Sequence, residues 1–273
     1  KEGERGGEIG DCQGLMVYGL KIDDLNLPSI IHQFAELRQG FVLVTGPTGH
    51  GKSTTVASIL QEINVNRKAH IVSIEDPIEY LLQPQKSVIS QREIGGDTLS
   101  FSSALKSCLR EDPDVVFVGE MRDLESISLA LTIAETGHLV FSTLHTNSAA
   151  QTIDRIIDVF PEGSKSQIKL QLANVLGAVI SQRLLPTLNN SRAPAVELLI
   201  ANAAVKNSIR EGKTHMIDNI IQTSLDFGMI SLERSLADMV KKGVVDIETA
   251  QSFSLRPEEL NRQLRGFSGS KDS

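Results

Sequence analysis

The stretch Gly46–Ser53, GPTGHGKS, matches every fixed position of the phosphate-binding loop pattern G-x-x-x-x-G-K-[ST]. The apolar run Phe41–Thr45 (FVLVT) precedes it, and a helical pattern, Lys52–Ile63, follows it. A strand, a glycine-rich loop and a helix in this order are the context in which the motif binds nucleotide phosphates. The sequence therefore predicts an α/β fold built around a site for ATP.

Each position of the loop has a chemical reason. Gly46, Gly49 and Gly51 allow the tight turns that direct backbone N–H groups toward phosphate oxygens. Lys52 is expected to reach the β- and γ-phosphates, and the Ser53 hydroxyl is expected to ligate Mg²⁺. The other positions counted with the nucleotide site are Pro47, Thr48, His50, whose ring is expected to face solvent, and Thr54, which mainly continues the helix.

Three further runs of continuous, mostly apolar residues predict buried strands: His70–Ile74, Val115–Val118 and His138–Leu144. Helical patterns lie between them at Phe101–Arg110 and Leu124–Glu135, the second with Asp123 as its N-cap. Strands that alternate with helices predict a mostly parallel sheet.

From Ser148 onward the pattern changes to helices in series. Ser164 and Gln167 fit a capping box ahead of a long periodic apolar run, Ile168–Leu185, which predicts a helix. A short apolar run, Ala195–Ile200, comes next. Further helical patterns cover Val205–Arg210, Met216–Phe227, Ser231–Lys242 and Pro257–Leu264. We expect a small helical subdomain after the α/β core.

Ligands of parallel sheets bind at the carboxyl ends of the strands, so the residues after each predicted strand are candidates. Glu75 and Glu79 follow the second strand, and spacing leaves open which of them activates the attacking water. Glu120 follows the third strand at the Walker-B position and is expected to hold Mg²⁺ directly or through water. His145 follows the fourth strand and is placed to sense a γ-phosphate. His138 opens that strand seven residues earlier, so the two histidines face opposite sides and form a poor metal pair.

The composition excludes several kinds of ligand. The 27 basic and 34 acidic residues give a net charge of −7, and aromatic residues make up 4% without any Trp. This balance argues against broad nucleic-acid or anionic-membrane binding and against a base-stacking platform. The two cysteines cannot form a four-ligand zinc site. No run approaches the ~18 apolar residues of a membrane span, so we expect a soluble, intracellular protein.

Four segments together resemble a known family. They are GPTGHGKST from Gly46, SIEDPIEY from Ser73, REDPDVVFVGEMRD from Arg110 and TGHLVFSTLHTNSA from Thr136. In this order they resemble the Walker A, Asp box, Walker B and His box of the bacterial secretion ATPase superfamily. The residues of these segments are most similar to those of the PilT-like type IV pilus retraction ATPases, and the resemblance runs from about residue 25 to about residue 260.

The resemblance implies a RecA-like P-loop core in a hexameric ring that uses Mg²⁺ and ATP to disassemble pili. Such a ring works at the cytoplasmic face of the bacterial inner membrane, on the pilus machinery and its platform protein. The resemblance favours Glu79 over Glu75 as the base, gives Glu120 the Walker-B role, and places His145 on the γ-phosphate. His138 is the other His-box histidine, and both His138 and Glu75 are counted with the nucleotide site. The domains it implies are 1–22, a remnant of a PAS-like domain with a linker; 23–185, the core; 186–266, the helical subdomain; and 267–273, a disordered tail.

Three departures from the family pattern limit what the resemblance implies. Because the sequence begins at Lys1, the resemblance leads us to expect that it lacks the family's N-terminal domain and the arginines that complete a neighbour's site. Lys206 replaces an arginine where the retraction proteins carry AIRNLI and this chain has AVKNSI. The four-cysteine zinc motif of type II secretion ATPases is absent. The open alternatives are a pilus extension or secretion ATPase, a nucleotide-binding adaptor without useful hydrolysis, and a nucleic-acid translocase.

Overall fold

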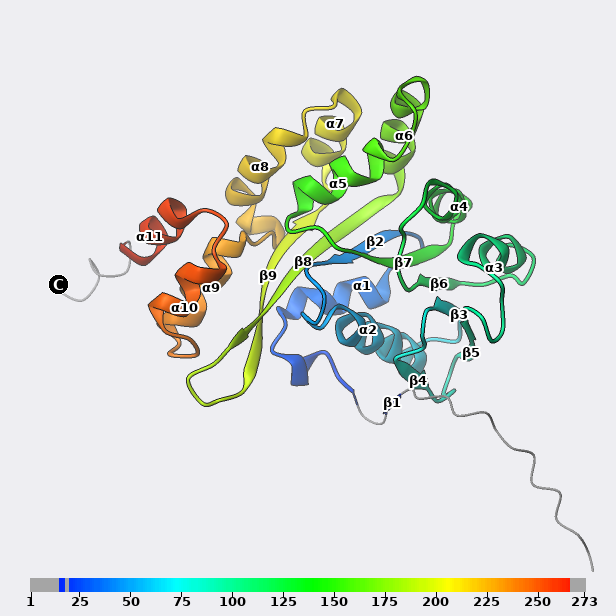
Figure 1. Cartoon of the computed structure of the whole chain (residues 1–273), viewed down its shortest axis with the longest axis horizontal. Coiled ribbons are helices and arrows are strands. Elements are labelled where there is room, and N and C mark those ends of the chain that lie inside the picture. Colours follow the sequence, from blue (N-terminus) through cyan, green and yellow to red (C-terminus); the bar gives the residue numbers. More distant parts are fainter. Residues whose placement is uncertain (1–14, 18–19, 266–273) are drawn as a thin grey trace, which may run out of the picture.

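The computed structural model describes residues 15–17 and 20–265, and a seven-stranded sheet lies at its centre (Figure 1). In spatial order the strands are β5 (Val88–Glu93), β3 (His70–Glu75), β6 (Val115–Val118), β7 (Leu139–Leu144), β2 (Gly40–Thr45), β8 (Leu176–Pro186) and β9 (Arg192–Ile200). The first six run parallel, and β9 pairs antiparallel with β8. A separate two-stranded sheet pairs β1 (Leu15–Val17) with β4 (Tyr80–Leu82).

Helices cover both faces of the sheet (Figure 1). One face packs against α1 (His32–Glu36) and α2 (Lys52–Asn66). The other packs against α3 (Phe101–Cys108), α4 (Leu124–Glu135), α5 (Ala149–Asp158), α6 (Glu162–Val175), α7 (Ala203–Glu211) and α8 (Ile217–Thr223). Alternate residues of β2 therefore enter different cores: Phe41 and Leu43 face α3–α8, and Val42 and Val44 face α2. This is why the strand reads as a continuous apolar run.

A third core lies at the far end of the β8–β9 ribbon. There Leu185 and Ala195 pack against α9 (Leu232–Lys241), α10 (Ile247–Phe253) and α11 (Pro257–Arg265). The connections include four 3-10 helices: η1 (Asp23–Leu25), η2 (Ser29–Ile31), η3 (Thr214–Met216) and η4 (Leu225–Phe227). Within the described chain, no helix is both long and apolar enough to span a membrane.

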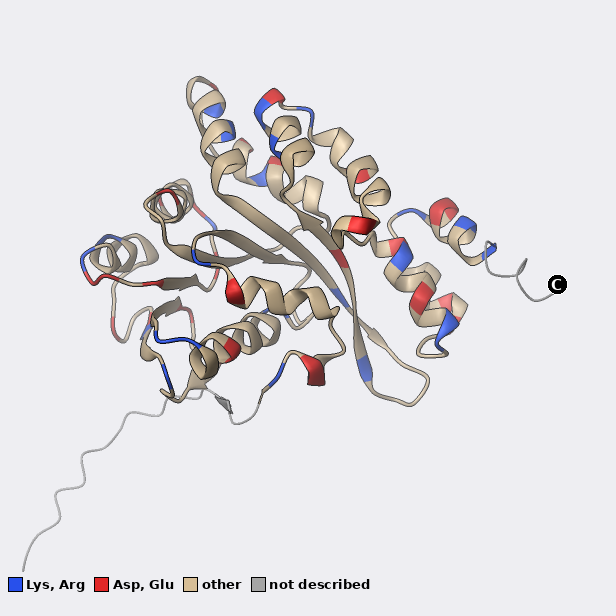
Figure 2. Cartoon of the chain, turned by 180° about the vertical axis from the view of Figure 1, so that it is seen from behind, with Lys and Arg blue, Asp and Glu red and all other residues tan. Residues whose placement is uncertain are grey.

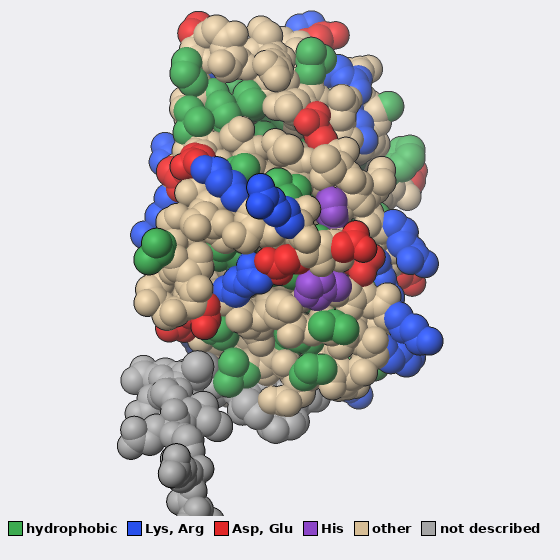
Figure 3. All heavy atoms as spheres, turned by 90° about the vertical axis from the view of Figure 1, so that its right-hand side faces the viewer, with side chains coloured by type: hydrophobic (Ala, Val, Ile, Leu, Met, Phe, Trp, Pro, Cys, Tyr) green, Lys and Arg blue, Asp and Glu red, His purple; other side chains and the backbone are tan. Residues whose placement is uncertain are grey.

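Charged side chains of both signs are mixed over the surface. In the view from behind, both acidic and basic residues lie on the outer helices, and the long β8–β9 ribbon also carries both signs (Figure 2). The side on which α3 and α4 lie shows acidic, basic and histidine side chains next to one another (Figure 3). The basic residues on that side are therefore not gathered into a single-sign surface of the kind that tracks a polyanion.

The expected fold class is confirmed: the chain is α/β with a mostly parallel sheet of the RecA-like type and a helical C-terminal segment. The four expected strands are β2, β3, β6 and β7, although β7 begins one residue after His138. Asp123 caps α4 as expected, since its carboxylate accepts from the N–H of Ser126 at 2.9 Å. The short strands β4 and β5 and helix α10 have weaker patterns and were not expected.

The expected helix Ile168–Leu185 is wrong in its second half. Helix α6 ends at Val175, and Leu176 begins β8, which pairs with β2 and β9. The capping box is wrong too, because α6 begins at Glu162 after Pro161 and has no side-chain cap. The stretch VLGAVIS is rich in β-branched residues and is buried on both sides, so sheet pairing overrides the helical period.

Parts of the expected domain division lie outside the described residues, namely 1–14, 18–19 and 266–273. The sheet continues to Ile200, past residue 185, where the core domain is expected to end. The division into a core and a helical subdomain stays a prediction, and the helices in series begin at Ala203.

Candidate nucleotide-binding and catalytic site

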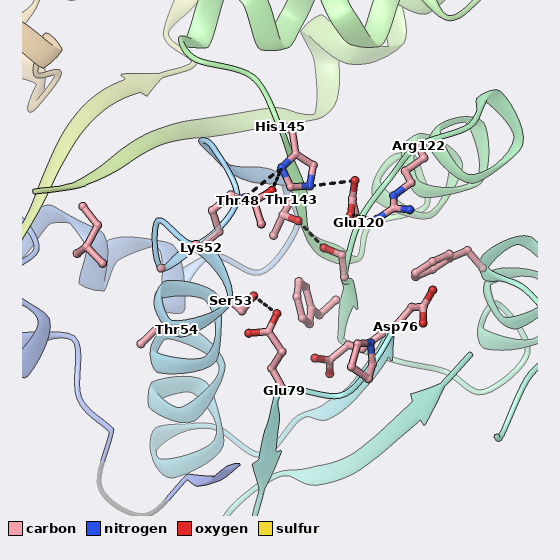
Figure 4. A pocket seen from close by; sticks show the side chains of 18 of the residues that line it. Thr48, Lys52, Ser53, Thr54, Asp76, Glu79, Glu120, Arg122, Thr143 and His145 are labelled. Carbon is pink, nitrogen blue, oxygen red and sulfur yellow. Dashed lines mark hydrogen bonds and ion pairs between the residues drawn. The ribbon is translucent and has the colours of Figure 1, made fainter. Parts of the chain in front are cut away.

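A cavity of about 470 Å³ lies at the carboxyl ends of the central strands (Figure 4). Its lining includes the phosphate-loop residues, the first turn of α2, the segment after β3, and Glu120 and His145 after β6 and β7. The volume is within the range of small-molecule sites, and this edge is where parallel sheets bind their ligands. Most of the expected site residues therefore share one space.

The backbone of the loop fits a phosphate. Gly46, Gly49 and Gly51 have φ values of 144°, 78° and 81°, which residues with a Cβ rarely adopt. A Cβ at Gly46 would lie 2.3 Å from the carbonyl oxygen of Gln182 on β8. Within the described chain, the loop amides of Gly49 and Gly51 donate to no other group. With the first turn of α2, they form an N–H cradle of the kind that binds phosphate oxygens.

Lys52 lies at the base of the loop and is 8% exposed. Its Nζ donates to the carbonyl oxygens of Gly46 at 2.9 Å and Pro47 at 3.0 Å. Burial lowers the pKa of Lys52, while the nearby Glu120 and Glu79 carboxylates act in the opposite direction. The ammonium group is thus held inside the cavity by the same loop that would bind phosphate.

His145 bridges the phosphate loop and the Walker-B acid. Its Nε2 lies 3.1 Å from Glu120 Oε1, and its Nδ1 lies 3.4 Å from Lys52 Nζ and 3.3 Å from Thr48 Oγ1. Because a carboxylate only accepts, Nε2 carries the proton, and Nδ1 accepts from Lys52 and Thr48. A single imidazole therefore connects the lysine with the acid.

Glu120 has a second partner that the sequence did not single out. Arg122 donates to its Oε2 at 2.7 Å, and this hydrogen bond is the main reason that the pKa of Glu120 lies below its usual value. The hydrogen bond from His145 adds to the effect, and burial opposes it. Glu120 is therefore held as a carboxylate on the cavity wall.

The oxygen donors in the cavity fit Mg²⁺. Ser53 Oγ donates to Glu79 Oε1 at 2.7 Å, and Glu120 lines the same space. The described residues contain no cluster of three His, Cys, Asp or Glu that could hold a metal alone. A hydroxyl and one or two carboxylates, completed by water and substrate phosphates, is the donor set that Mg²⁺ prefers.

The two candidate bases differ in their surroundings. Glu75 is 7% exposed, and its carboxylate accepts from Ser73 Oγ at 2.6 Å and Gln91 Nε2 at 3.4 Å. Burial raises the pKa of Glu75. Both glutamates line the cavity, but the exposed carboxylate of Glu79 lies against Ser53 in the first turn of α2. The geometry favours Glu79 for contact with a water beside the γ-phosphate.

Two histidines counted with the nucleotide site do not line the cavity. His138 lies at the amino end of β7, where its Nδ1 is 3.0 Å from the carbonyl oxygen of Ile133. It is seven positions before His145 along an extended segment, or roughly 23 Å away, so the structure does not bring it to the site. His50 does not face solvent, because its Nδ1 accepts from the N–H of Leu184 at 2.9 Å.

The sequence did not predict several residues of the cavity wall. Asp76, Arg122 and Thr143 lie inside the quoted segments, but the sequence analysis gave none of them a role. Arg192, at the start of β9, also lines the cavity. It lies in a stretch without a motif, so nothing in the sequence pointed to it. Thr54 lines the cavity as well, but its hydroxyl lies 2.7 Å from the Tyr80 hydroxyl.

A buried carboxyl group on β9 accepts a hydrogen bond from the start of α5, the helix that follows His145. Glu197 of β9 is 1% exposed, and its Oε1 accepts from the N–H of Ala149, the first residue of α5, at 2.7 Å. Its Oε2 has no hydrogen-bond partner among the described residues. Burial raises the pKa of Glu197 to about 7, with the hydrogen bond from Ala149 and the charge of Arg256 opposing the shift.

This carboxyl group makes stability depend on pH. The folded chain binds more protons than the unfolded chain between pH 4.5 and about pH 7, so the free energy of unfolding falls as pH rises through that window. The full contribution is about 3 kcal/mol. Glu197→Gln keeps an oxygen that accepts from Ala149 but does not titrate. Its free energy of unfolding, relative to that of wild type, is therefore expected to rise by that amount between pH 4.5 and pH 9. Chemical denaturation across this range measures it, and parallel profiles for the two proteins would contradict it.

Three features lie at one edge of the parallel sheet: a phosphate loop between β2 and α2, an acid after β6 and a histidine after β7. Together they define a RecA-like P-loop protein. The chain belongs to the type II/IV secretion system protein family, whose model matches residues 15–247.

The chain is similar in sequence and in structure to pilus retraction proteins. The chain is 52% identical to a twitching motility protein of Neisseria gonorrhoeae over 89% of this chain and 65% of the relative. It is 47% identical to the type IV pilus retraction ATPase PilT of Pseudomonas aeruginosa over 88% of this chain and 70% of that protein. A crystal structure of the pilus retraction motor PilT with bound ADP matches with a TM-score of 0.84 and 47% identity, over 89% of this chain and 69% of the other. The chain thus spans about two thirds of the length of these relatives.

Proposed function

We propose that this chain is the motor part of a Mg²⁺-dependent ATPase that powers type IV pilus retraction and thereby twitching motility. The convergence of Lys52, Ser53, Glu79, Glu120 and His145 on one cavity carries the proposal. The identity to a twitching motility protein and to a pilus retraction ATPase supports the direction of the mechanical work.

The phosphate loop and its lysine bind the transferred group. Lys52 exchanges its carbonyl acceptors for γ-phosphate oxygens, where its charge offsets the negative charge that develops during transfer. The N–H groups of the loop hold the other phosphates. His145 contacts the γ-phosphate and, because it also touches Glu120, links the presence of that phosphate to the Walker-B acid.

Glu79 orients the attacking water and accepts its proton. Both glutamates line the cavity, but the carboxylate of Glu75 is buried and bonded to Ser73, while that of Glu79 lies beside the phosphate loop at Ser53. Ser53 and Glu120 are the residues that would hold Mg²⁺, which offsets phosphate charge when bound. Arg122 must release or share Glu120 for this, because both compete for the same carboxylate.

We further propose that the protein works as a homo-hexamer at the cytoplasmic face of the inner membrane. Its partner there is the pilus machinery with its platform protein, and closure between subunits moves the C-terminal helices. The similarity to the solved retraction motor supports this assembly. The interleaved charges on the side seen in Figure 3 give no support to a nucleic-acid substrate.

Deletion of the gene is expected to leave cells that carry surplus pili and do not twitch, because pili would be assembled and never withdrawn. Electron microscopy of surface pili and a twitching assay measure the two outcomes. Cells without pili would assign the chain to pilus extension, and unchanged pili and motility would contradict both roles.

The purified full-length protein is expected to release phosphate from ATP only with Mg²⁺ present. Chelation with EDTA should reduce the rate at least ~100-fold, and added Mg²⁺ should restore it, because the metal offsets phosphate charge in the transition state. Tight ATP binding without phosphate release, at a protein concentration that permits assembly, would instead indicate a nucleotide-binding adaptor.

A further inference from the structure

The phosphate loop is attached to a strand outside every recognised motif. Gln182 lies in β8, beside the loop strand β2 in the sheet, and is 3% exposed. Its side-chain Nε2 donates to the carbonyl oxygen of His50, in the middle of the loop, at 2.8 Å. Its Oε1 accepts from the hydroxyl of Thr55, in the first turns of α2, at 2.7 Å.

These two hydrogen bonds define the orientation of the amide group. The Thr55 hydroxyl donates to Gln182, so the oxygen faces α2 and the NH₂ group faces the loop carbonyl. The side chain therefore connects the loop with the helix that follows it. Both partners are buried or partly buried, so neither bond is readily replaced by water.

Backbone contacts of the same strand add to this attachment. The carbonyl oxygen of Gln182 is close enough to Gly46 that only a glycine fits there. The N–H of Leu184 donates to His50 Nδ1, and the His50 ring lies 6.4 Å from the ring of Phe253 on α10, with an angle of 55° between the rings. Three points of the loop therefore rest on β8.

We propose that Gln182 is a positioning residue that sets the conformation of the phosphate loop and thereby its affinity for nucleotide phosphates. A loop with three glycines at positive φ has many accessible conformations, and only one directs its N–H groups into the cavity. Holding that conformation before binding removes part of the entropy that the ligand would otherwise have to offset. The proposal rests on the proposed nucleotide site, and it adds a residue that acts on the site through the loop.

Gln182→Ala is expected to raise the Kd for ATP and for ADP about 10-fold, equivalent to about 1.4 kcal/mol. The KM for ATP should rise in parallel, with kcat within about 2-fold of wild type, since Gln182 contacts no reacting group. Fluorescence titration with a labelled ADP, followed by competition with ATP, measures the affinities on the full chain.

Gln61→Ala is a matched control for the loss of a buried glutamine. Gln61 lies in α2 and is 5% exposed, and its side chain pairs with Asn64 rather than with the loop. This variant should lose stability to a similar extent and keep the wild-type Kd. Equal increases in Kd for Gln61→Ala and Gln182→Ala would show a general loss of stability and overturn the proposal.

Gln182→Glu keeps the proposal testable if the alanine variant does not fold. Its carboxylate can accept from Thr55 but cannot donate to the His50 carbonyl, so its Kd should also rise. Wild-type affinity in this variant or in Gln182→Ala would overturn the positioning role. If the wild-type chain itself binds no ATP or ADP, the proposed nucleotide site fails, and that result is separate from the comparison between variants.

Discussion

Lys52→Ala is expected to remove ATP hydrolysis almost completely, with a fall in kcat/KM of at least ~10³-fold. The lysine is buried against the loop, and its ammonium lies within 3.4 Å of His145 and 3.0 Å of two loop carbonyls. Among the residues described around the cavity, the two arginines of the lining, Arg122 and Arg192, are both exposed, so Lys52 is the buried cation. Its removal leaves phosphate charge inside the cavity without a buried counter-charge.

Lys52→Arg tests whether the positive charge alone is sufficient, or whether the shape of the lysine ammonium is also required. A guanidinium carries the same charge but is planar and larger, so it does not fit the place of an ammonium that donates to two loop carbonyls. We expect it to lose activity nearly as fully as the alanine variant. Lys206→Ala, on α7, is the control and should hydrolyse ATP at the wild-type rate. A Lys52→Ala protein with more than a tenth of wild-type activity would contradict the role of this lysine.

The sequence predictions that the structure confirms came from local patterns that are compatible with one kind of structure. A glycine-rich octapeptide between an apolar run and a helix has few other uses, and the structure places it between β2 and α2. Strands buried on both faces read as continuous apolar runs, and four were found in this way. The cap at Asp123 followed from its position before a periodic segment.

The failures share a cause in tertiary structure. The run from Ile168 to Leu185 has helical periodicity and no turn signal. Its second half nevertheless forms a strand, because it pairs with β2 in the sheet, and this tertiary pairing overrides the local helical pattern. His50 was expected to face solvent because it lies in a loop, and a single backbone N–H of β8 holds its ring inward instead. Arg192 lines the cavity and Gln182 contacts the phosphate loop, and both lie at sequence positions with no pattern, so only the folded chain brings them there.

Glu79→Gln is expected to reduce kcat by about 10²–10⁴-fold while ATP binding stays within a few-fold of wild type. The amide oxygen of the variant can still accept from the Ser53 hydroxyl, so the pocket should keep its shape. What the variant loses is the capacity to take a proton from water. Phosphate release and ATP affinity, measured on the same full-length protein, separate these two properties.

Glu75→Gln is the matched substitution because the two glutamates are four residues apart on the same segment. Its amide oxygen can replace the carboxylate as acceptor for Ser73, and burial already raises the pKa of Glu75 and so disfavours its charge. We expect less than a ~10-fold fall in kcat. The Glu75 carboxylate lines the cavity, but it accepts hydrogen bonds from Ser73 and Gln91 and is therefore less available to a water. If Glu75→Gln is the inactive variant and Glu79→Gln retains turnover, the base is Glu75. In that case the hydrogen bond between Glu79 and Ser53 serves the Mg²⁺ site instead of water activation.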